Sequence, residues 1–151
     1  MSSHPDQLDF FHAPVFPVRS PVAKIDLSRF RAKLKRSMAR AIRECPFERT
    51  EVAARMAGYL GLQSFSKAAL DAYTAESKEG HDISLVRFKA FVRATGAVWL
   101  WDELVSDDGL TLLEGDEVRL AEIGYWQQEI ERAQANYKAL KAAHVQVRRG
   151  R

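Results

Sequence analysis

Apolar residues recur at every third or fourth position along most of the chain after residue 22, the spacing that places them on one face of an α-helix. The clearest case is the segment 27–44, where one apolar stripe is flanked by basic side chains on the remaining faces. No segment alternates apolar and polar residues as a half-buried strand does. We therefore predict an all-α protein with helices at about 27–44, 49–60, 67–76, 83–95, 98–105 and 116–147.

Short polar residues and glycine mark several of these helix ends. Asp26 or Ser28 can cap the start of the first helix, Ser66 that of the third and Ser84 that of the fourth, because their side-chain oxygens accept hydrogen bonds from free backbone N–H groups. Gly61 follows the second helix, where its freedom to adopt positive φ suits a helix end. The first five helices are expected to form one bundle, in which Leu70 anchors the third helix against the second and fourth.

The last helix has a regular heptad pattern, typical of a coiled-coil seam. Such a stripe must be buried, either against Trp99, Trp101 and Leu104 of the same chain or against a second copy. The strict alternation of three- and four-residue steps favours a seam between helices, so we expect a homodimer. The residues expected in the seam are Ile123, Trp126, Ile130, Ala133, Tyr137 and Leu140, continued by His144 and Val147.

Three regions follow from these patterns. Residues 1–22 contain four of the five prolines and are expected to form an irregular arm. Residues 23–106 form the helical bundle, and residues 107–151 form an acidic linker and the last helix with a basic tail. The arm either is a tail without a role or docks on the bundle or on a second subunit through Phe10, Phe11 and Phe16.

Charge is unevenly distributed, although the net charge is only +3. The span 19–55 holds eleven basic and four acidic residues, whereas 107–131 holds eight acidic residues and one arginine. A concentrated basic block favours a polyanionic partner such as nucleic acid. The alternative is that these residues are only the solvated faces of helices.

Several classes of protein are disfavoured by the residues present. Cys45 is the only cysteine, which excludes an intramolecular disulfide and the usual cysteine-based zinc sites. The four histidines are scattered, and no phosphate-binding loop of the form GxxxxGK[ST] occurs. We therefore expect no catalytic residues, no metal and no cofactor. Without a signal peptide or a run of ~20 apolar residues, a cytoplasmic protein that does not enter the membrane is expected.

The segment 47–104 resembles the helix-turn-helix of the lambda-repressor-like family. The matching features are Thr50-Glu51-Val52-Ala53 at the start of the second helix, a glycine turn, Leu70 and Tyr73 on the third helix, and the fourth helix ending at Thr95-Gly96. The turn is longer than usual in that family, and the usual glutamine at the head of the third helix is absent. The segments 66–73, 79–84 and 94–96, with the long last helix, also resemble small predicted regulators of Mu-like transposable phages and prophages.

In that family the second helix crosses the DNA backbone and the third enters the major groove. The resemblance therefore implies a double-stranded DNA partner, a regulatory role and a set of contact residues. Lys67 can reach a phosphate or a guanine edge, and Ala68 is small enough to approach a thymine methyl. The full set is Arg40, Arg49, Arg55, Ser64, Ser66, Lys67, Ala68, Asp71 and Thr74. The alternative is a protein–protein interaction module that inhibits or recruits a host protein.

Overall fold

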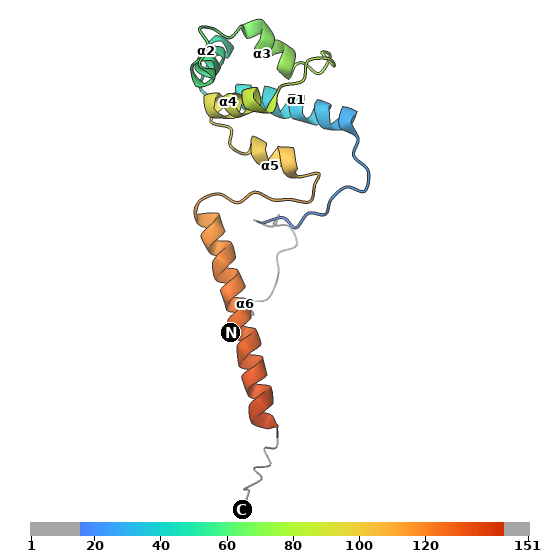
Figure 1. Ribbon diagram of the computed structural model, residues 1–151, viewed down its shortest axis with the longest axis vertical. Helices are drawn as coiled ribbons and strands as arrows, with labels where there is room; N and C mark the ends of the chain where they lie inside the picture. The colour runs from blue at the N-terminus through green and yellow to red at the C-terminus, as the bar shows by residue number, and fades with distance from the viewer. Residues whose placement is uncertain (1–15, 144–151) are drawn as a thin grey trace, which may run out of the picture. The chain divides into compact units, whose positions relative to one another are not determined.

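The computed structural model describes residues 16–143 and confirms an all-α protein with a long C-terminal helix (Figure 1). It divides into two units, the first ending at Leu112 and the second beginning at Leu113. Within residues 16–143, the first unit contains five helices and the second contains one. Their bounds are α1 Leu27–Glu44, α2 Arg49–Leu60, α3 Lys67–Thr74, α4 Leu85–Thr95, α5 Leu100–Val105 and α6 Asp116–Ala142.

The predicted helix starts are confirmed by hydrogen bonds. Asp26, Ser66 and Ser84 each accept a bond from the backbone N–H three residues further along, at 3.0, 3.1 and 3.4 Å. Gly61 ends α2 with a φ of 65°, a conformation that other residues adopt only at a cost in free energy. These ends depend on a few neighbouring residues, which explains why the sequence could place them.

The third helix is shorter than predicted, since it ends at Thr74 rather than near Glu76. Ala75 is extended, with φ −90° and ψ 118°. The ammonium group of Lys35, a side chain in α1 that is almost completely buried, donates to the carbonyls of Ala75 and Lys78. These bonds stabilise a turn in place of another turn of helix.

The core of the first unit joins all five of its helices. α2 packs along α4 more extensively than any other pair, and α1 packs against α3 and α5. Leu70 is fully buried, as predicted, but α3 packs chiefly against α1 and α2, where the sequence predicted α2 and α4. The largest fully buried side chains are Phe88, Phe91, Met38, Met56, Leu70, Leu100 and Val52.

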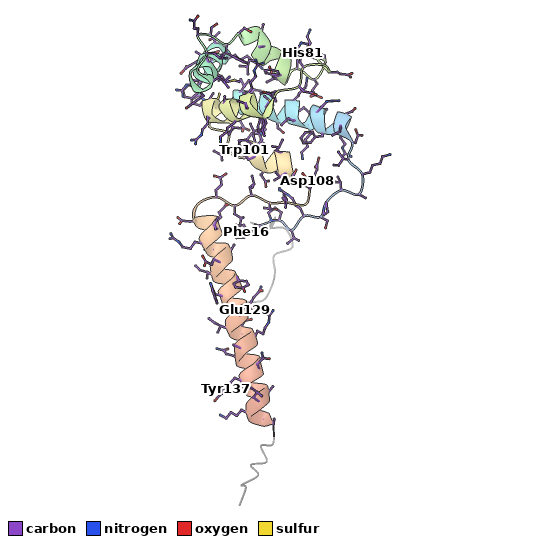
Figure 2. The ribbon with its side chains drawn as sticks, in the orientation of Figure 1. Phe16, His81, Trp101, Asp108, Glu129 and Tyr137 are labelled. Atoms are coloured by element: carbon purple, nitrogen blue, oxygen red, sulfur yellow. The ribbon has the colours of Figure 1, made fainter. Side chains whose placement is uncertain are left out.

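Within the first unit, α3 and α5 lie on opposite sides of α1 and α4 (Figure 1). Figure 2 shows the same separation, with His81 in the loop after α3 and Trp101 on α5. The Trp101 ring meets Phe88 of α4 edge to face, with 5.1 Å between ring centroids. A residue can therefore be assigned to the α3 side or to the α5 side of this unit.

The segment before α1 docks on α5 and on the loop that follows it. Arg19 makes two hydrogen bonds to the carboxylate of Asp102, at 2.8 and 2.7 Å, and the Val22 N–H donates to the Asp107 carbonyl at 2.9 Å. A Cβ on Gly109, whose φ is 76°, would lie 2.6 Å from the Pro21 nitrogen, so only glycine fits there. These contacts extend the first unit to Leu112, beyond the boundary predicted after residue 106.

Phe10 and Phe11 lie outside the described residues, as do the predicted seam positions His144 and Val147. The sequence left open whether the arm docks on the bundle. For residues 16–22 it does, through Arg19 and Val22.

The second unit contains α6, which buries none of its residues. Trp126 is 57% exposed and Leu140 72% exposed, and Glu129 and Tyr137 project from the helix (Figure 2). None of the described helices combines the length and hydropathy needed to cross a membrane. The seam predicted for α6 is therefore a surface in this structure.

Candidate nucleic-acid interface

The link between α2 and α3 sets the position of the predicted recognition helix. After Gly61 the chain turns back, and the Leu62 N–H bonds to the Ala57 carbonyl at 2.9 Å. Four residues then lead to α3. Phe65, in this link, stacks on Tyr73 of α3 with 6.4 Å between ring centroids. The link is therefore packed against the helix that it introduces.

Four of the nine predicted contact residues lie together at the start of α3. Ser64, Ser66, Lys67 and Ala68 are all exposed. The Ser66 hydroxyl oxygen accepts from the Ala69 N–H at 3.1 Å. That bond occupies a lone pair and leaves the O–H free to donate to an anion.

Three further predicted residues bind one another, although the Arg49 and Asp71 side chains remain partly exposed, at 34% and 46%. A single terminal nitrogen of Arg49 donates to Asp71 at 2.8 Å and to the Thr74 hydroxyl at 3.1 Å. Thr74 is buried and its hydroxyl donates to the Leu70 carbonyl, so its predicted contact with a base is wrong. Asp71 also lies 4.0 Å from the ammonium nitrogen of Lys67, which places a negative charge between two cations.

The last two predicted residues stack on aromatic rings. Arg55 pairs with Glu51 at 3.3 Å, and its guanidinium lies 3.5 Å from the Phe47 ring centroid. Arg40 pairs with Glu44 at 2.6 Å and lies 4.8 Å from the ring centroid of Trp99. The hydrogen bond that Arg40 donates to Glu44 is the main cause of a raised pKa for Arg40.

The basic block as a whole is largely neutralised within the first unit. Among the described residues, seven of its eleven cations lie within 4.0 Å of a carboxylate. The positive surface is therefore much weaker than the composition of residues 19–55 suggests. The seven are Arg19, Arg31, Lys33, Arg36, Arg40, Arg49 and Arg55.

Sequence analysis missed three cations on α4. Arg87 donates to the Tyr73 hydroxyl and lies 5.7 Å from the centroid of the Phe65 ring, so it braces α3. Lys89 and Arg93 are exposed and make no ion pair with any residue in the described range. The available signal was that α4 contains no acidic residue.

Lys89 and Arg93 do not extend the α3 surface. Both line a hollow together with Val98 and Trp101, and Trp101 belongs to the α5 side of the unit (Figure 2). Two arginines of the predicted set, Arg49 and Arg55, belong to α2 next to α3. The structure therefore separates the candidate interface, at α2 and α3, from the unpaired cations of α4.

Between residues 16 and 143, no group of three His, Cys, Asp or Glu side chains is placed to hold a metal ion. Cys45 is half-buried and its thiol lies 3.3 Å from the Ile42 carbonyl. No family model, curated protein or solved structure matches this chain. Its function must therefore be inferred from its residues.

Proposed function

We propose that this protein binds double-stranded DNA through the exposed start of α3 and acts as a transcriptional regulator. The main support is that Ser64, Ser66, Lys67 and Ala68 share this surface, while Leu70 behind them is completely buried. A helix held firmly on one side can present small and polar side chains to the major groove. The resemblance to regulators of Mu-like phages and prophages supports the same role.

Most of the groups on this surface can bind phosphate, and two of its side chains can also contact bases. The Ser66 O–H and the free backbone N–H groups of the first helical turn are donors that a phosphate accepts. Lys67 can reach a phosphate or the O6 and N7 atoms of guanine, and Ala68 leaves room for a thymine methyl. Arg49 uses one terminal nitrogen for Asp71 and Thr74, so its other N–H groups can serve the DNA backbone.

DNA titration of the whole chain tests this proposal. Sequences selected from a random pool would be titrated at about 50 and 200 mM salt, where phosphate contacts predict a steep loss of affinity. Lys67→Ala should weaken binding to the selected sequence by ~1–3 kcal/mol, or about 5- to 150-fold. Lys89→Ala is the matched control, because it removes another exposed lysine, one that lies on the α5 side.

The variant Asp71→Asn, measured in the same titration, is expected to bind DNA more tightly than the parent. Asp71 holds Arg49 at 2.8 Å and lies 4.0 Å from Lys67, so removing its charge should strengthen DNA binding at low salt. The proposal fails if affinity is independent of salt, or if Lys67→Ala and Lys89→Ala weaken binding equally.

A second candidate is a protein–protein interaction module, the alternative raised by the sequence. The observation that favours it is the exposure of Leu85 and Val86, adjacent residues at the start of α4, at 65% and 69%, because neighbouring exposed apolar side chains can mark a docking surface. Weak binding to DNA of any sequence, combined with a stoichiometric complex with a host protein, would favour this candidate.

A further inference from the structure

α6 exposes an apolar seam whose spacing reads the same in both directions. Its six predicted residues follow steps of three, four, three, four and three, and none is buried. A seam with this symmetry can meet an identical helix running the opposite way, with every seam residue still in the contact. The pattern therefore permits an antiparallel pair as readily as a parallel one.

The distribution of charge along α6 differs in its consequences for a parallel and an antiparallel pair. Its first half, 116–129, carries four acids and one arginine, whereas its second half, 130–142, carries three basic residues and one acid. The helix dipole adds a partial positive charge at the start and a partial negative charge at the end. Two parallel copies would place like halves and like helix ends side by side, whereas two antiparallel copies would place opposite halves together.

We infer that α6 pairs with α6 of a second copy of this chain in antiparallel orientation. In this register Ile123 faces Leu140 of the second copy, Trp126 faces Tyr137, and Ile130 faces Ala133. The same contacts occur twice, because the two-fold axis crosses the pair between Glu131 and Arg132. The inference concerns α6 alone and does not depend on DNA binding.

Packing favours the same orientation. A parallel pair would put Ala133 opposite Ala133 and Trp126 opposite Trp126, leaving a gap at the Ala133 level and crowding at the Trp126 level. The antiparallel pair places Ala133 opposite the larger Ile130 and joins Trp126 to Tyr137, which evens out the volumes.

Spin labels on the full-length chain test the direction. In a Cys45→Ser background, a single label would be placed at Ala121 or at Gln128, both exposed positions on the side away from the seam. In an antiparallel pair the two Ala121 labels are offset by about 32 Å along the axis and the two Gln128 labels by about 10 Å, at 1.5 Å per residue. A parallel pair has no offset at either position.

We expect the Ala121 distance to exceed the Gln128 distance by ~10–20 Å, and light scattering to give the mass of two chains. Ile130→Glu should return the mass to one chain, while Glu131→Gln, on the outer side of the helix, should not. Equal distances at the two positions would overturn the orientation. A mass of one chain at roughly tens of micromolar, or of more than two chains, would overturn the pairing.

Discussion

The first unit and α6 use the same sequence pattern with opposite results. α1 and α6 both repeat apolar residues every three or four positions, but α1 buries Met38, Ala41, Ile42 and even Lys35, whereas α6 buries nothing. The difference arises because α1 meets α3 and α5 within its own unit. Periodicity therefore identifies a helix and its apolar face, but it does not identify what covers that face.

The largest expected difference between the two regions is the loss of stability when a large apolar side chain is removed from each. Leu70→Ala removes a fully buried side chain and should destabilise the first unit by ~2–5 kcal/mol, through lost burial and the cavity left behind. Trp126→Ala removes a larger side chain from α6, yet it should leave the unfolding of the first unit unchanged. Thermal unfolding followed by circular dichroism measures both, and a comparable loss in the two variants would show that α6 is part of the same core.

A smaller effect should appear at the docked arm and should depend on pH. The pKa of Asp102 lies below its ordinary value of 3.8, mainly because the carboxylate accepts hydrogen bonds from Arg19. A carboxyl whose pKa is lowered by folding stabilises the folded state above its unfolded pKa, and this contribution is lost as the pH falls through the folded pKa.

Asp102→Asn should therefore cost about 1 kcal/mol near pH 7, because the pair is only partly shielded from solvent. The difference in unfolding free energy between this variant and the parent should shrink as the pH falls below about 4. Denaturant titrations from pH 7 to pH 2 provide the test. A difference that stays constant over this range would show that the charge of Asp102 does not stabilise the arm.

The smallest expected effect is the stability gained when a glycine inside a helix of either region is replaced. Gly58 in α2 and Gly124 in α6 both have open space where a Cβ would lie. Replacing a glycine within a helix by alanine stabilises the helix by ~0.5–1 kcal/mol. Gly58→Ala should raise the melting temperature of the first unit by a few degrees, whereas Gly124→Ala should only increase the helical signal of α6. An equal rise in both variants would indicate a single cooperative unit.

Much of the fold was predictable because its signals are local. α1 and α2 begin and end where the sequence predicted, at Leu27–Glu44 and Arg49–Leu60. Asp26 caps the first of them and Gly61 ends the second. A cap depends on one turn of backbone, so it can be recognised without knowing what packs against the helix.

The sequence predicted only in part which basic residues remain available, because several cations of the basic block are paired over long distances in the sequence. The acids that bind Arg31, Arg36 and Lys33 lie in loops and helices forty or more residues away. Their approach depends on how the helices pack, which no local pattern encodes. The same holds for Thr74, which lies inside because α3 packs against α1 and α2.

Most helix bounds, the apolar faces and the separation of charge along the chain follow from the order of residues, because each depends on neighbours within a few turns. Packing determined which charges remain available and which faces are covered. It paired five cations of the basic block with carboxylates distant in the sequence, buried Lys35 against the end of α3 and left Lys67 at the exposed start of that helix. Charges interact according to distance in space, and that distance is set only when the helices come together.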